Sequence, residues 1–162
     1  MNIIDLKLAQ SHIPTLADWH HREWAYLNPG GSVQKRIEKM QGYLGENVTP
    51  SMFVAKEAET LLGSAALVQH DMETKMELSP WLASVYVAPD YRNRGIGSAL
   101  VKQVVNVAQT AGYSTLYLFT PSKENFYKSL GWLTLSLTLS KELFHNEPVT
   151  VMQYPLYNQT AR

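Results

Sequence analysis

The sequence predicts an α/β fold, in which a mixed and mostly antiparallel central sheet of about six to seven strands is flanked by about four helices. The hydrophobic periodicity changes along the chain in the order strand, two helices, three strands, helix, strand, helix, two strands. The 162 residues, 45% hydrophobic and 17% charged, suit one ordinary globular core. No repeat or break in composition marks a boundary, so we expect a single domain over residues 1–162.

The first half of the chain contains one predicted strand, two helices and a hairpin. Residues Ile3–Leu8 alternate apolar and polar side chains, which is typical of a strand. Pro14 opens a helix that continues to Leu27, where Asn28-Pro29-Gly30-Gly31 ends it. Ser32 is the predicted N-cap of a second helix. A hairpin follows, with strands at 52–56 and 61–69.

The second half contains the clearest helix, over Gly97–Ala111. Its apolar residues recur at spacings of three and four, and Gly112 stands where a helix-ending glycine belongs. The other predicted elements are strands at 82–87, 116–119, 133–139 and 149–156 and a short helix at 123–130.

Composition excludes several classes of function. The chain has no cysteine, so disulfides, thiolate metal sites and a cysteine nucleophile are ruled out. Basic and acidic residues balance at 14 each, which argues against a general nucleic-acid binder. No signal-peptide pattern or membrane-spanning apolar run is present, so we expect a cytoplasmic protein without membrane contact. We predict no metal site, because the neighbours in His20-His21-Arg22-Glu23 point apart on a helix.

The segment from Val85 to Ser98 has the features of an anion site. A strand leads through a loop rich in glycine and arginine into the start of the best helix. A helix start offers unpaired backbone N–H groups and a partial positive charge. Gly95 and Gly97 allow close approach to the backbone, and Arg92 and Arg94 add charge, so a pyrophosphate would fit here.

Simpler interpretations of this loop stay open. The glycines alone allow a tight turn, and the arginines alone are compatible with a solvated surface. The two common phosphate-loop patterns do not fit, since no lysine follows Gly97 and residue 100 is leucine.

What fits is Arg-x-x-Gly-x-Gly at Arg92–Gly97, directly after a Val-x-Val-x-Pro strand end. A second segment has the strand Leu116–Thr120 followed by Asn125–Trp132, which contains Phe-Tyr-x-x-x-Gly-Trp. Over about residues 80–135 the chain resembles the GNAT family of N-acetyltransferases.

The resemblance implies that acetyl-coenzyme A is the acetyl donor and that no metal takes part. It places pantetheine along the backbone of Val85, Tyr86 and Val87, with an N–H near Val87 polarising the acetyl carbonyl. It places the pyrophosphate on the amides of Arg92, Asn93, Arg94, Gly95, Ile96, Gly97 and Ser98. It gives Tyr127 the role of general acid to the leaving thiolate, whereas on its own this tyrosine would be read as packing beside Phe126 and Trp132.

Two positions depart from the family pattern. Thr120 stands where many members have asparagine, and Ala83 and Ser84 stand where many have an acidic base. We therefore assign no base. The candidates by position are Asp71, Glu73, Glu77, His20, His21 and Glu23. The aromatic residues expected to wall the acceptor pocket are Trp19, Trp24, Tyr26 and Trp81.

The leading hypothesis is an acetyl-coenzyme A-dependent N-acetyltransferase acting on a primary amine, of a small molecule or of a protein. The second is a non-catalytic acyl-coenzyme A-binding sensor or regulatory module. A nucleotide-binding protein is the third, and the motif mismatches weigh against it. We expect an amine acceptor as partner, no nucleic acid, and a monomer or homodimer.

Overall fold

A computed structural model describes residues 1–135 and 142–156 of the chain. Within these ranges the strands are β1 Asn2–Asp5, β2 Ser51–Glu57, β3 Thr60–Val68, β4 Trp81–Val87, β5 Thr115–Thr120, β6 Leu133–Thr134, β7 Glu142–Phe144 and β8 Glu147–Pro155. They form one sheet in the order β1-β2-β3-β4-β5-β8-β6, with β7 paired to β8. Among the described strands only β4 and β5 pair in parallel, so the predicted mixed, mostly antiparallel sheet is confirmed.

Four α-helices lie in the described ranges, in agreement with the prediction: α1 Ile13–Trp24, α2 Val33–Met40, α3 Ile96–Thr110 and α4 Glu124–Ser129. The predicted cap of α2 is confirmed, since Ser32 Oγ accepts the Lys35 N–H at 3.0 Å. Gly112 follows α3 with φ of +91°, as a glycine after a helix should. Short 3₁₀ turns cover Leu6–Leu8, Gln10–His12, Ala25–Leu27, Gln41–Leu44, Glu73–Lys75 and Pro89–Tyr91.

Some predicted boundaries are wrong. The first strand ends at Asp5, whose Oδ1 accepts the Lys7 N–H at 2.8 Å and so turns residues 6–8 into a 3₁₀ turn. Helix α1 ends at Trp24 rather than at residue 27, and a 3₁₀ turn continues it. The strand predicted over 133–139 is the two-residue β6, and positions 136–139 lie outside the described residues.

Strand β7 was not predicted at all. It pairs with β8 through a two-residue turn, His145-Asn146, in which both residues have positive φ. Asparagine in such a turn is a hairpin signal that the sequence carried.

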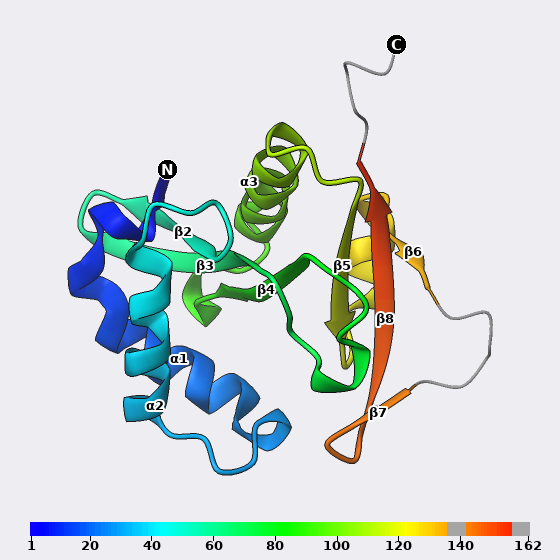
Figure 1. The fold of residues 1–162 in the computed structure, drawn as a ribbon. Helices are drawn as coiled ribbons and strands as arrows, with labels where there is room; N and C mark the ends of the chain where they lie inside the picture. Colours follow the sequence, from blue (N-terminus) through cyan, green and yellow to red (C-terminus); the bar gives the residue numbers. More distant parts are fainter. Residues whose placement is uncertain (136–141, 157–162) are drawn as a thin grey trace.

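The helices cover both faces of the sheet (Figure 1). On one face α1 and α2 pack on β1–β3, in a cluster that includes Leu16, Met40 and Met52. On the other face α3 and α4 pack in a cluster that includes Leu100 and Trp132. Because helices cover both faces, the middle strands β3, β4 and β5 are packed from each side and keep a fixed position.

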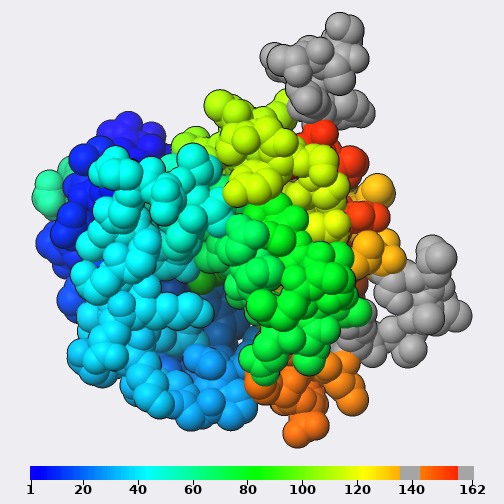
Figure 2. All heavy atoms as spheres, viewed as in Figure 1, coloured from blue at the N-terminus to red at the C-terminus, as the bar shows by residue number. Residues whose placement is uncertain are grey.

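The space-filling view shows a hollow between the blue and cyan segments of α1 and α2 and the green segment that follows β3 (Figure 2). The segment after β3 and the turn between β7 and β8 lie on the far side of this hollow. In the described part of the chain, no helix has the length and apolarity needed to cross a bilayer.

Candidate active site

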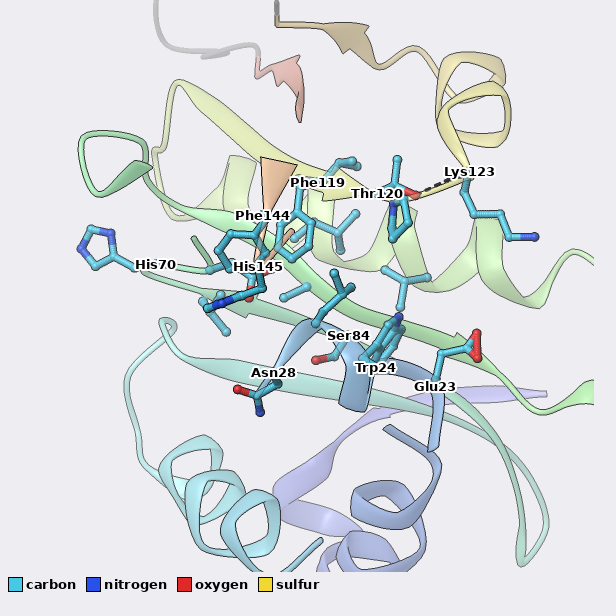
Figure 3. A pocket seen from close by; sticks show the side chains of 18 of the residues that line it. Glu23, Trp24, Asn28, His70, Ser84, Phe119, Thr120, Lys123, Phe144 and His145 are labelled. Carbon is cyan, nitrogen blue, oxygen red and sulfur yellow. Dashed lines mark hydrogen bonds between the residues drawn. The ribbon is translucent and has the colours of Figure 1, made fainter. Parts of the chain in front are cut away.

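Strands β4 and β5 separate after a single point of contact. Their register holds one pair, Trp81 with Tyr117, and the Tyr117 N–H donates to Pro80 O at 3.0 Å. Beyond that pair a cavity of about 810 Å³ opens, lined by residues 82–85 of β4 and 118–120 of β5. Glu23, Trp24 and Asn28 lie on one side of it, across from Phe119 and Phe144 (Figure 3).

Strand β4 contains a bulge in the part that has separated from β5. Ser64 of β3 faces Tyr86 and Ala66 faces Ala83, so Ser84 and Val85 together oppose a single residue. Ser84 has φ of +53°, and its carbonyl accepts a hydrogen bond from Ser64 Oγ at 2.8 Å. The bulge is therefore held by a side chain of the neighbouring strand.

His20 supports this bond from behind. Its Nε2 lies 2.9 Å from Ser64 Oγ, and because the serine hydrogen points to Ser84 O, the histidine N–H is the donor. Burial, and then the charge of Arg36, lower the pKa of His20 to about 3. His20 is therefore neutral at physiological pH and acts on the shape of β4.

At the far end of β4, the backbone of Val87 points away from β3. The Ala88 N–H donates to Leu62 O of β3 at 2.9 Å, so Val87, one residue earlier, turns its own N–H and C=O to the opposite edge. Val87 O accepts a hydrogen bond from Arg92 Nε at 2.8 Å, and the Arg92 guanidinium lies 5.6 Å from the centre of the Tyr86 ring. Arg92 thus lies at the open edge of β4.

The start of α3 is an uncapped helix N-terminus. Its N-cap is Gly95, with φ of +78° and no side-chain hydrogen bond to the first turn. The N–H groups of Ile96, Gly97 and Ser98 therefore have no capping side chain. Arg94 beside them pairs with Glu57 at 3.1 Å.

Gly97 faces the gap between β4 and α4. A Cβ atom placed there would lie 3.6 Å from the Phe126 ring and 3.7 Å from the Val87 side chain, which is ordinary contact. The gap therefore narrows with any larger side chain at this position.

Tyr127 lies at the boundary between the core and the cavity. Its ring packs 5.0 Å from Phe126 and 6.1 Å from Trp132, and it also lines the cavity. Burial raises the pKa of the Tyr127 phenol, so the group keeps its proton at neutral and moderately alkaline pH.

Two of the four aromatic residues expected around the acceptor do line the cavity, namely Trp24 and Tyr26. The expectation is wrong for the other two. Trp81 is fully buried, and its Nε1–H donates to Leu78 O at 2.8 Å. Trp19 packs against Tyr86, with 5.4 Å between ring centres, and is not part of the lining.

Three of the six candidate bases line the cavity: Glu23, Asp71 and Glu73. Burial raises the pKa of Asp71 to about 6, and Lys39 acts in the opposite direction. Glu73 Oε1 lies 3.0 Å from His145 Nε2. The remaining candidates, Glu77, His20 and His21, are not among the lining residues.

Sequence reasoning missed the contribution of α2. Arg36 and Lys39 line the cavity, and Tyr43 lies beside them. Arg36 falls among Val33, Ile37 and Met40, so a cation at the spacing of the buried stripe was the available signal. Within residues 1–135 and 142–156, no three His, Asp or Glu side chains gather as a metal site would require.

Comparison with known proteins identifies the family of this chain. A family model described as an acetyltransferase (GNAT) domain matches residues 49–133, just over half of the chain. The chain belongs to the GNAT acetyltransferase family. The matched range includes β4, the 92–98 loop, α3 and Tyr127, whereas α1 and α2 lie outside it.

Individual relatives are distant. An uncharacterized N-acetyltransferase, ycf52, from Gracilaria tenuistipitata var. liui is 28% identical over 106 residues, which cover 64% of this chain. The match spans 56% of that relative's length.

Two solved structures share the GNAT fold along nearly the whole chain. A phosphinothricin acetyltransferase from Sinorhizobium meliloti, in complex with AcCoA, aligns with a TM-score of 0.73 at 19% identity, covering 99% of this chain and 91% of that one. A spermidine N-acetyltransferase from Vibrio cholerae, in complex with CoA and spermine, aligns with a TM-score of 0.71 at 16% identity, covering 95% and 94%.

Proposed function

We propose that this GNAT protein transfers the acetyl group of acetyl-CoA directly to a primary amine, with Tyr127 as the acid beside the leaving sulfur. The observation that carries the proposal is the divergence of β4 from β5. Because the two strands share one register pair, the free edge of β4 and the side chain of Tyr127 border the same cavity.

The residues present suit coenzyme A. The backbone of Val85 and Val87 on the open edge offers hydrogen bonds to the amides of pantetheine, as one strand offers them to another. The uncapped amides of residues 96–98 and the positive end of α3 suit the pyrophosphate. Arg92 lies at the same edge of β4, and a guanidinium there suits a phosphate oxygen.

Acetyl-CoA supplies a thioester: the amine nitrogen forms a bond to the acetyl carbon, the carbon–sulfur bond breaks, and the proton lost by the amine is balanced by one gained at sulfur. Tyr127 keeps its phenol protonated and so presents an O–H to that sulfur. An ordinary thiol has a pKa of about 8.5, below that of a buried phenol, so Tyr127 as acid shares its proton with the developing thiolate in a hydrogen bond, and the proton released by the amine completes the thiol.

The acceptor side favours an amine. Trp24 and Tyr26 offer aromatic faces, and Glu23 and Asp71 offer carboxylates, to a cationic substrate. Ala83 and Ser84 supply no acidic side chain that could act as a base. The second candidate function is therefore a module that binds acyl-CoA without turnover.

The test is substitution of Tyr127→Phe. Acetyl-CoA should raise the melting temperature of both forms to the same degree, because the phenol oxygen is not needed for binding. Release of free thiol with an amine panel should fall by about a hundredfold in the variant. Tyr117→Phe is the matched control, since its ring packs on Trp81 away from the cavity.

Three outcomes separate the alternatives. Unchanged turnover in Tyr127→Phe contradicts the role of the phenol. Stabilisation by acetyl-CoA without turnover of any amine by the unsubstituted protein identifies the non-catalytic module. No stabilisation by acetyl-CoA contradicts both.

A further inference from the structure

The part of the cavity proposed to bind the acceptor contains cationic side chains, which do not favour a substrate that carries only an ammonium group. Arg36 and Lys39, one helical turn apart on α2, both line the cavity opposite the residues of β4. A substrate carrying only positive charge would meet repulsion from both side chains. Lys39 interacts with Asp71, so Arg36 is the cation of this pair that an anionic group on the substrate would best suit.

One donor of Arg36, its Nε–H, is buried and unsatisfied within the described residues. Loss of solvent lowers the pKa of Arg36, and the neighbouring Tyr43 acts in the opposite direction. A buried donor without an acceptor is costly, and an anion of the substrate would satisfy it.

The same cavity also contains carboxylates, and Asp71 is near enough to Lys39 for the lysine charge to lower its pKa. Asp71 and Glu23 line the cavity together with Arg36, and Glu73 is already paired with His145. One wall therefore offers cations from α2, while acidic and aromatic side chains come from α1 and from the segment after β3. This division of charge matches a molecule with an ammonium group at one point and an anion at another.

We propose that the acceptor is a small zwitterionic amine of the amino-acid class, whose carboxylate is held by Arg36 and Lys39 while its amine faces the acetyl donor. The proposal rests on the proposed acetyl transfer and adds the class of substrate. The cavity volume of about 810 Å³ lies in the range of small-molecule sites. A bidentate guanidinium–carboxylate contact would then set the position of the amine.

The experiment compares matched pairs of probes. ω-Aminoalkanoates of increasing length and α-amino acids are each assayed beside the corresponding carboxamide, which keeps the size and removes the negative charge. We expect the ratio of kcat/KM, acid over amide, to be about tenfold or more for the best length. Calorimetric binding of the same pairs to the CoA-loaded protein should show the same preference without any need for turnover.

Variants assign the preference to the guanidinium. Arg36→Met should bring the acid-to-amide ratio close to one, whereas Arg36→Lys should retain part of it. Arg22→Met is the matched control, because Arg22 is an exposed arginine of α1 that pairs with Asp18 and does not line the cavity. Melting temperatures of all variants exclude a loss of fold as the cause.

Failure of this inference and failure of the proposed function give different results. Equal use and equal binding of acids and amides, or an acid preference that survives in Arg36→Met, overturn the zwitterionic acceptor. If no amine is acetylated although acetyl-CoA binds, the proposed function is wrong, and the calorimetric pairs still decide whether Arg36 holds a carboxylate.

Discussion

Residues 85–98, the proposed cofactor side of the site, are one continuous segment, of which Val85 lines the cavity. The proposed acceptor side is assembled from α1, α2, the segment after β3 and the turn between β7 and β8. The family model covers the whole of the first side. It leaves out Arg36 and His145, which belong to the second. We infer that the matched part of the fold holds the cofactor, and that α1, α2 and the turn between β7 and β8 contribute to the choice of acceptor.

The two sides also differ in what they offer a ligand. The cofactor side offers mainly backbone: the edge of β4 and the uncapped amides at the start of α3. The acceptor side offers charged and aromatic side chains. Substitutions that add charge should therefore have the strongest effect on the first, and substitutions that remove charge the strongest effect on the second.

The largest effect is expected for Gly97→Asp. A carboxylate at the start of α3 would occupy the position of the pyrophosphate and should weaken coenzyme A binding by about a hundredfold. The same charge should stabilise the free protein slightly, because an acidic residue in the first turn interacts favourably with the helix dipole. Titration calorimetry and thermal unfolding measure the two effects separately.

Gly97→Asn is the control of equal size for this prediction. Since a Cβ atom at position 97 meets only ordinary contacts, the neutral variant should fold normally and lose less affinity than the aspartate. Equal losses for the two variants would mean that space, and not charge, governs the site.

A smaller effect is expected at the two arginines, and they should differ. Arg92 lies at the open edge of β4, whereas Arg94 is already paired with Glu57. Arg92→Met should weaken coenzyme A binding by about three- to tenfold, and Arg94→Met by less than about twofold. Repeating the titration at rising salt should shrink the Arg92 effect, since ions screen the attraction. A stronger effect at Arg94 would contradict the positions seen here.

The cofactor side could be predicted from the sequence more fully than the acceptor side. The turn at Gly95 and the start of α3 follow local rules that depend on neighbouring residues, and they were predictable from the motif. The cavity itself was not, because it depends on where β4 leaves β5. We expect the bulge at Ser84 to contribute to this point, and its bond to Ser64 joins residues 20 apart in the sequence.

The acceptor side was the least predictable part. Trp81 and Trp24 look alike in sequence, yet one is fully buried in the core and the other lines the cavity. The position of Arg36 in the apolar stripe of α2 indicates partial burial, but the cavity that it lines exists only once α2 has packed on the sheet. Tertiary packing decides these cases, and periodicity reports only which face of an element is apolar.

A pH-dependent effect should arise from Asp71, whose folded-state pKa of about 6 exceeds its ordinary value of 3.8. Because the folded protein binds this proton more tightly than the unfolded chain, the carboxyl destabilises the fold as pH rises from about 4 to about 6. Asp71→Asn should therefore raise the free energy of unfolding at pH 7 by about 1 kcal/mol or more.

The charged Asp71 carboxylate, which destabilises the fold, should strengthen binding of the acceptor amine. Above pH 6 the Asp71 carboxylate is charged and attracts an ammonium group, so KM for the amine should rise several-fold as pH falls through 6. In Asp71→Asn this dependence should disappear. Denaturant titrations and KM profiles between pH 5 and 8 test both statements, and a dependence that persists in the variant would show that another group is responsible.

The smallest effect on activity is expected for Ser64→Ala, which acts only through the shape of β4. The substitution removes the donor to Ser84 O and the acceptor for His20, so two partly or fully buried groups lose their partner. We expect the free energy of unfolding to fall by about 1–3 kcal/mol and kcat/KM to fall by about threefold as the bulge relaxes. Ser51→Ala is the control, because the Oγ of Ser51 is buried in β2 without a hydrogen-bond partner and its removal should cost little. If Ser64→Ala lowers stability and leaves kcat/KM unchanged, the bulge keeps its form without this bond, and the opening between β4 and β5 is fixed by packing on both faces of the sheet.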